Sequence, residues 1–191
     1  MQERLGRNPW QTAWRRLSRN RTAVAGLFLL AVIVLACFSA PLWFDYQRDV
    51  VGVNIAQRLR IPVEGKPLGT DELGRNLLAR ILWGGRVSLT IGIGSVVLAS
   101  LAATLIGTVA AYYGGRTDSL LMRALDVLLA IPAMLLMVTF GAIMAPTQTN
   151  LMLAIGLSFV PGMARLVRAQ VLSVKDLEYV AAVRAQGAST A

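Results

Sequence analysis

Side chains that could carry catalysis are scarce in this chain of 191 residues. It has no His, two Lys, and a single Cys, Cys37, which lies inside an apolar run. A Ser-His or Cys-His nucleophile pair is therefore excluded, and a His/Cys metal site is not expected. Neither Lys66 nor Lys175 belongs to a G-x-x-x-x-G-K-[ST] sequence, so the chain has no phosphate-binding loop. We expect no enzyme activity and no cofactor on this chain.

The chemistry that the sequence does offer is docking, and it lies in residues 173–191. The stretch KDLEYVAAVRAQGASTA directly follows an apolar run and reads as a short helix with a glycine turn. One face of this helix repeats at i, i+3, i+4 and i+7, a spacing typical of a helix that lies in a partner's groove. That face consists of Leu177, Val180, Ala181 and Arg184. Gly187 lacks a Cβ and can adopt the positive φ that turns the chain.

The composition indicates which kind of protein presents this segment. Hydrophobic residues make up 55% of the chain and charged residues 15%, against roughly 25% charged residues in soluble domains. The net charge of +9 could suggest nucleic acid, but the basic residues lie between apolar runs. Such placement is typical of membrane topology. We expect contact with membrane lipid and no nucleic-acid partner.

Four apolar runs are long enough to cross a bilayer, which takes about 20 residues. They cover residues 23–44, 87–113, 119–145 and 150–172. The sequence therefore predicts an all-α, polytopic transmembrane protein. In the fourth run, Arg165 and Arg168 must reach towards the interface, because a charge at mid-bilayer is costly.

Basic residues predict the orientation. The tail, residues 1–22, holds six Arg and one Glu, which favours a cytoplasmic N-terminus. Four spans then return residues 173–191 to the cytoplasm and leave residues 45–86 outside. Within this connector we predict an amphipathic helix over residues 71–83, capped by Thr70 and ended by Gly84-Gly85. It could simply orient the second span, or it could form a platform that meets a delivery protein.

Small residues recur at every fourth position of the second span, and they predict close helix packing. They are Ser95, Ala99, Ala103, Gly107 and Ala111.

The next two spans hold residues that could form a gate. Asp126 is expected to pair with Arg123 on one helix face. Pro132 should kink the third span, because it lacks a backbone N–H. Pro161-Gly162 predicts a second break in the fourth span.

Several segments resemble the C-type permease of the oligopeptide/dipeptide ABC-importer family. They are NPWQTAWRRLSRNRTAVAGL (8–27), PLGTDELGRNLLARILWGGRVSLTIG (67–92), AYYGGRTDSLLMRALDVLLAIP (111–132) and VPGMARLVRAQVLSVKDLEYVAAVRAQGAS (160–189). Nickel and glutathione importers share the pattern, so the resemblance does not fix the substrate. It implies a bacterial or archaeal cytoplasmic-membrane subunit with the type I importer permease fold, which has six spans. Residues 87–191 then form an incomplete permease domain, and we expect a chain truncated within its coupling loop.

The resemblance also assigns a role to the docking segment. The family's Glu-Ala-Ala-x-x-x-Gly pattern falls on Ala181, Ala182, Val183 and Gly187, so the usual Glu is missing, although Glu178 stands one turn earlier. The residues implied in coupling to an ATPase are Leu177, Glu178, Val180, Ala181, Ala182, Arg184 and Gly187. The implied partners are a second permease, two cytoplasmic ABC ATPases that bind ATP and Mg²⁺, and an extracytoplasmic substrate-binding protein.

Two other functions remain open on the residues alone. An ATP-independent channel or carrier fragment would conduct without any partner. A membrane scaffold or assembly protein would bind partners without transport. Copurification of an ATPase separates the permease from both.

Overall fold

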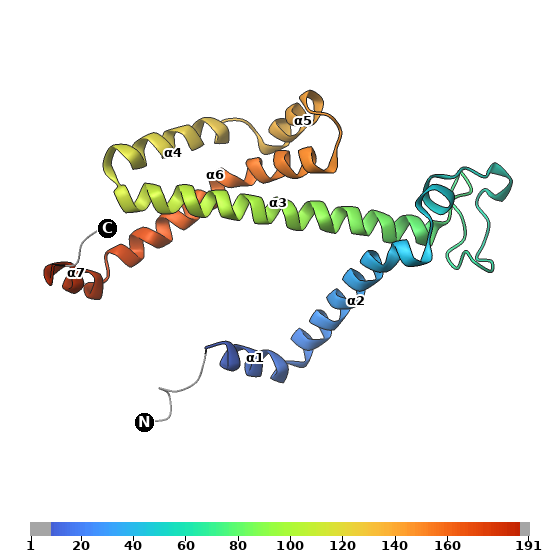
Figure 1. The fold of residues 1–191 in the computed structure, drawn as a ribbon, viewed down its shortest axis with the longest axis horizontal. Coiled ribbons are helices and arrows are strands. Elements are labelled where there is room, and N and C mark those ends of the chain that lie inside the picture. Colours follow the sequence, from blue (N-terminus) through green and yellow to red (C-terminus); the bar gives the residue numbers. More distant parts are fainter. Residues whose placement is uncertain (1–8, 188–191) are drawn as a thin grey trace. The chain divides into compact units, whose positions relative to one another are not determined.

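The computed structural model describes residues 9–187, and every regular element among them is a helix (Figure 1). The helices are α1 (Pro9–Arg19), α2 (Arg21–Trp43), α3 (Leu77–Tyr113), α4 (Gly115–Leu129), α5 (Ala133–Ile143), α6 (Gln148–Lys175) and α7 (Glu178–Ala185), with a π-helical turn at Tyr46–Val51 and a 3-10 turn at Ile55–Gln57. The described residues form only isolated β-bridges and no strand. The all-α prediction is confirmed. Residues 1–8 of the predicted tail and 188–191 of the docking segment lie outside the described part of the chain.

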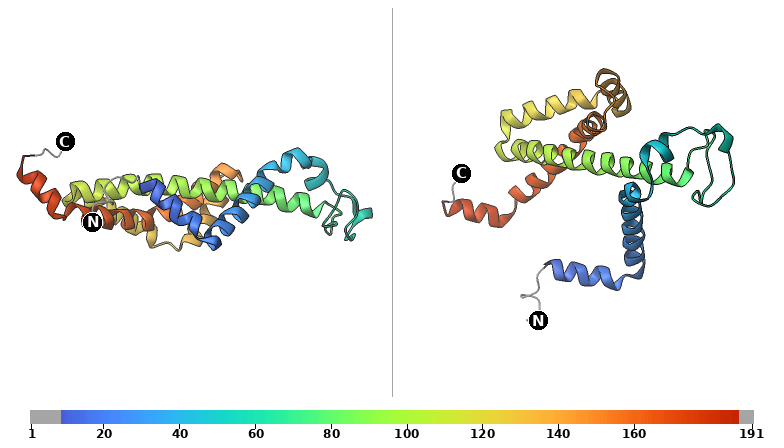
Figure 2. Two further views of the ribbon diagram at one scale, coloured as in Figure 1. Left: turned by 90° about the horizontal axis from the view of Figure 1, so that it is seen from below. Right: turned by 45° about the vertical axis from the view of Figure 1, so that its right-hand side comes forward.

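Within the described residues, three helices are long and apolar enough to cross a membrane, namely α2, α3 and α6. Helices α4 and α5 together make a fourth candidate span, but they are bent by 81° at the break between them. The four predicted apolar runs thus correspond to three continuous helices and one broken pair, which are labelled in Figure 1 and seen from two further sides in Figure 2. The chain divides into two compact units, residues 1–89 and 90–191, which are described separately.

In the first unit, α2 starts at a capped end. The side chain of Asn20 accepts a hydrogen bond from the backbone N–H of Ala23, which satisfies one of the free donors of the first turn. Most of α2 exposes apolar side chains, whereas Cys37 and Ala40 are buried. Cys37 lies against the first turns of α3, because a Cβ at Gly85 would be 2.6 Å from its Sγ. The glycine therefore permits close packing of the two helices.

The prediction of a helix over residues 71–83 is wrong. Residues 71–76 form turns, and α3 begins at Leu77. Gly74 has a φ of +76°, and a Cβ there would lie 1.8 Å from the carbonyl oxygen of Asn54, so this residue cannot sit in an α-helix. Thr70 does not cap a helix, because its hydroxyl joins Gln57 and Arg60 across the loop. The loop's own long-range contacts outweigh the local helical pattern.

Gly84-Gly85 does not end a helix either. Helix α3 continues through both glycines to Tyr113, a run of 37 residues that joins the end of the connector to the second span. Two glycines cost such a helix about 1 kcal/mol each relative to Ala.

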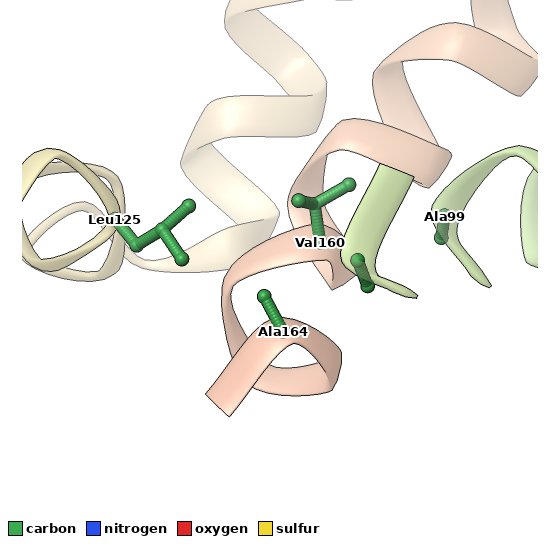
Figure 3. Close-up of a cluster of buried hydrophobic side chains, with 5 residues drawn as sticks. Ala99, Leu125, Val160 and Ala164 are labelled. Atoms are coloured by element: carbon green, nitrogen blue, oxygen red, sulfur yellow. The ribbon is translucent and has the colours of Figure 1, made fainter. Parts of the chain in front are cut away.

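The core of the second unit is built from small side chains of three helices. Figure 3 shows Ala99 of α3, Leu125 of α4, and Val160 and Ala164 of α6, which form one buried cluster with Ala103. Every member of the row predicted to pack, from Ser95 to Ala111, is buried. Gly107 makes the closest approach, since a Cβ there would lie 2.6 Å from the carbonyl oxygen of Ala164. Small residues allow this backbone-to-backbone contact.

The two prolines behave differently. At Pro132 the helix is broken rather than kinked, because Pro lacks the N–H and also disfavours helical geometry at Ile131. At Pro161 the predicted break is wrong, since α6 runs through it without interruption. Pro161 is fully buried on the packed face of α6. The proline removes one hydrogen bond from this helix, and the packed face keeps the helix continuous.

Candidate coupling site

The candidate site is the end of α6 together with α7. Helix α6 stops at Lys175, and the backbone N–H of Asp176 closes it by donating to the carbonyl of Leu172 at 3.2 Å. Only Asp176 and Leu177 separate the two helices, and α7 then spans Glu178–Ala185. Gly187 follows with a φ of +86°, the left-handed value that the sequence predicted. A short helix thus projects from a candidate membrane span through a joint of two residues.

The described side chains of α7 and of Leu177 just before it present a mixed surface. Leu177 is 44% exposed and Tyr179 is 61% exposed, while Val180 is half-buried. Glu178 and Ala182 are exposed. The backbones of Ala181 and Arg184 belong to α7, but their side chains lie outside the described part of the chain. Exposed Leu and Tyr side chains beside a carboxylate suit docking into a groove with an apolar floor and a polar rim.

Sequence reasoning did not single out Tyr179, although a large aromatic side chain next to an amphipathic face is a common anchor at interfaces. The sequence does contain this signal, because Tyr179 lies beside Val180 in the segment whose spacing predicts docking.

Charged side chains hold the C-terminal half of α6 against α4. The guanidinium of Arg168 donates two hydrogen bonds to the carboxylate of Asp118, each 2.5 Å long, and both side chains are mostly buried. Arg165 binds the carboxylate of Asp126, and these side chains are about half exposed. The prediction that Asp126 pairs with Arg123 is therefore corrected, since its partner is Arg165. Asp126 is bound from the neighbouring helix, because α6 places Arg165 within reach.

Lys175 makes a third contact of this kind, with α3. Its Nζ donates to the carbonyl oxygens of Ala111 at 3.2 Å and of Tyr112 at 3.0 Å. Helix α3 ends at Tyr113, so these carbonyls belong to its last turn, where side chains commonly supply hydrogen bonds. A cation is also favoured there by the helix dipole. Lys175 thus caps the C-terminus of α3.

The ion pairs between α4 and α6 line an open cavity of about 520 Å³. Its walls include Gly115, Ser119, Met122 and Arg123 beside the four paired residues. No nucleophile and base are paired there, and among residues 9–187 no group of three or more His, Cys, Asp or Glu is placed to hold a metal ion. The cavity is bordered by charged side chains of two packed helices.

The four residues predicted to form a gate differ in their exposure to solvent. Asp126 is exposed apart from its pairing with Arg165, and Pro132 is exposed at the break before α5. Pro161 is buried within α6, and Gly162 beside it is exposed.

Outside the helices, the connector forms a tightly bonded loop around Asp71. Its carboxylate accepts hydrogen bonds from the backbone N–H groups of Leu73 and Arg75, both 2.9 Å long. The guanidinium groups of Arg75 and Arg80 bind the same carboxylate. Partial burial alone would raise the pKa of Asp71, but these hydrogen bonds outweigh it and lower the pKa to about 2.

A second contact set closes the same loop. The ammonium group of Lys66 donates to the side chain of Gln57 at 2.5 Å and to the carbonyl of Gly74 at 3.4 Å. Asn76 is buried and donates to the carbonyl of Gly65. These side chains border a cavity of about 240 Å³. The connector therefore has a defined structure of its own.

Comparison with known proteins gives two matching families. The family described as the N-terminal TM domain of oligopeptide transport permease C matches residues 8–60. The family described as the binding-protein-dependent transport system inner membrane component matches residues 96–191, which include α7.

Individual relatives match most of this chain. The dipeptide transport system permease protein DppC of Alkalihalophilus pseudofirmus is 36% identical over 94% of this chain and 59% of the relative. The glutathione transport system permease protein GsiD of Pectobacterium atrosepticum is 39% identical over 96% and 60%. The oligopeptide transport system permease protein OppC of Bacillus subtilis is 33% identical over 95% and 59%. The chain thus spans about three-fifths of the length of these relatives.

Proposed function

This chain belongs to the family of binding-protein-dependent transport system inner membrane components, and we propose that it is a permease subunit of an ATP-driven importer. One observation carries the proposal. The family match runs through a candidate membrane span and into α7, a short helix directly beyond that span, and Tyr179 of α7 and Leu177 just before it are exposed. A transport subunit without a phosphate-binding loop needs such a handle, because its energy comes from another chain.

The proposed assembly contains a second permease subunit and two ABC ATPases that bind ATP and Mg²⁺. Closure of the ATPases on ATP displaces α7, and the paired permeases then switch access from one side of the membrane to the other. An extracytoplasmic binding protein delivers the solute. In this scheme the chain is a multi-pass protein of the cytoplasmic membrane with its N-terminus inside, as the six Arg of residues 1–22 favour.

The proposed cargo is a dipeptide, an oligopeptide or a similar small solute such as glutathione. Support comes from the relatives, which are described as dipeptide, oligopeptide and glutathione permeases. The bonded loop around Asp71 is the surface proposed to receive the binding protein, because its internal hydrogen bonds keep its shape without help from other chains.

The proposal is tested by purifying the tagged chain from its own membranes and reconstituting the complex in liposomes. We expect an ATPase chain to copurify, and uptake of a labelled dipeptide to require both ATP and the binding protein. A matched sample with a catalytically inactive ATPase should show no uptake. Ion current or solute flux from this chain without ATPase would favour a channel or carrier instead. A stable complex that never transports would favour a scaffold.

A further inference from the structure

Three basic residues of α6 bind other helices of the second unit, and each binds a different acceptor group. Arg165 and Arg168 bind carboxylates of α4, at Asp126 and Asp118, and Lys175 binds the carbonyls of Ala111 and Tyr112 at the end of α3. The three follow one another at spacings of three and seven residues, which places them on the same side of the helix. The last half of α6 is therefore attached along its length.

The contacts differ in strength. The Arg168–Asp118 pair is bidentate, with side chains 33% and 20% exposed, whereas the Arg165–Asp126 side chains are 51% and 53% exposed. Exposed pairs contribute little, because solvent screens them. Planar, two-bond pairing of Arg with a carboxylate fixes both distance and orientation. Arg168 is thus a stronger attachment than Arg165.

The position of Lys175 decides what these attachments do. It is the last residue of α6, and α7 begins three residues later, at Glu178. A push on α7 reaches the membrane helices through this joint. If α6 were free to bend there, the displacement would be absorbed locally. Because Lys175 ties the joint to α3 and Arg168 ties the same helix to α4, the displacement moves three helices together.

We propose that Arg168 and Lys175 are positioning residues that make α3, α4 and α6 respond to α7 as one body. This inference rests on the proposed function, since it concerns how energy from an ATPase reaches the pathway. It adds the residues that transmit the motion within this chain. Neither residue contacts the solute or the nucleotide in this scheme.

The first test is structural and does not depend on transport. Spin labels are placed at Thr117→Cys on α4 and Tyr179→Cys on α7, in a Cys37→Ser background, and the distance distribution is measured in lipid. Both sites are exposed. We expect a narrow distribution in the parent chain and a broad one in Lys175→Met and Arg168→Gln. The matched control is Arg116→Met, which removes an exposed basic residue near the same end of α4. An unchanged distribution in both test variants would overturn the proposal.

The second test measures coupling in the reconstituted importer. Losing a charge-assisted hydrogen bond shifts a two-state balance by about tenfold, so Lys175→Met and Arg168→Asp should raise the ATP hydrolysed per imported solute by about that factor. Lys175→Arg keeps the cation and should stay near the parent ratio. The exchanged pair Arg168→Asp with Asp118→Arg should recover most of the coupling that Arg168→Asp loses.

The two tests separate failure of this inference from failure of the proposed function. If the parent importer transports and the label distances broaden, but the coupling ratio stays constant, the positioning role is wrong while the importer stands. If the parent complex neither binds an ATPase nor transports, the proposed function fails, and the inference fails with it.

Discussion

The backbones of α3 and α6 approach each other closely at Gly107 and Ala164. A Cβ at Gly107 would lie 2.6 Å from the carbonyl oxygen of Ala164 and 2.9 Å from the Cβ of Val167. Neither obstacle is the end of a flexible side chain, so one of the two helices must move to admit even a methyl group. The contact therefore fixes how closely α3 and α6 approach.

This contact leads to the first prediction. Gly107→Ala should destabilise the protein by about 1–3 kcal/mol, the usual cost of overpacking a filled core. Gly92→Ala in the same helix is the matched control, because no atom of the described residues lies within 4 Å of a Cβ there. Relief of the glycine cost should make the control neutral or more stable by about 1 kcal/mol. Unfolding in a mixed-detergent titration measures both. Equal stability of the two variants contradicts the close approach.

The second prediction concerns the turn after α7. Gly187→Val should uncouple ATP hydrolysis from uptake, because Gly187 has a φ of +86° and a β-branched residue strongly disfavours that region. A left-handed backbone costs a non-Gly residue roughly 1–2 kcal/mol. Among residues 9–187 no atom lies within 4 Å of a Cβ at this site, so within that part of the chain the penalty comes from the backbone. Asn tolerates a positive φ, so Gly187→Asn should retain most of the coupling.

A companion variant checks the placement of the family's coupling pattern. Ala181→Glu restores the acidic residue that the pattern usually has at this position, so we expect uptake and ATPase binding to be preserved. If Ala181→Glu abolishes uptake while Gly187→Val leaves it normal, the segment is not the coupling site.

The third prediction follows from the pKa of Asp71. Its folded-state value of about 2 lies below the ordinary value of 3.8. The ionised carboxylate therefore stabilises the loop fully above about pH 4, and this contribution is lost as the pH falls through 2. A carbon-13 NMR titration of the labelled carboxyl should give a midpoint near 2. Arg80→Met removes one donor and should move the midpoint upwards. A midpoint of 3.8 in the parent chain would falsify the loop geometry.

The fourth prediction is topological. Single cysteines at Thr12→Cys, Glu64→Cys and Tyr179→Cys are introduced in a Cys37→Ser background. A membrane-impermeant thiol reagent added to intact cells should label position 64 and spare positions 12 and 179. Labelling of all three after lysis shows that each thiol is reactive. The reverse pattern in intact cells contradicts the orientation that the basic tail indicates.

Local patterns in the sequence predict the helical class and much of the docking segment. Apolar runs of sufficient length mark the spans, and the four-residue row of small side chains marks the buried face of α3. Gly187 is predictable in the same way, because a glycine after a short helix is the usual residue for a left-handed turn.

Contacts between distant residues were not predictable. Arg168 and Asp118 are 50 residues apart, and nothing local distinguishes Asp118 from Asp126 as the partner. The helical pattern over residues 71–83 likewise gave no sign of the carbonyl of Asn54, which leaves no room for a Cβ at Gly74, or of the left-handed φ of that glycine. A cationic side chain near a span does signal that some anionic partner exists. Its identity depends on tertiary packing.

The break at Pro132 has a consequence for the surroundings of the third apolar run. Helix α5 has 11 residues, so at 1.5 Å per residue it is ~16 Å long, about half the thickness of a hydrocarbon core. The chain between Leu129 and Ala133 leaves helical geometry and keeps only short local hydrogen bonds, such as that from Ile131 to the carbonyl of Leu128. Acyl chains offer no donors or acceptors to complete such backbone. If α4 and α5 cross the bilayer as a single span, the backbone at the corner between them must contact protein or water. Lipid can then contact α4 and α5 themselves but not this corner.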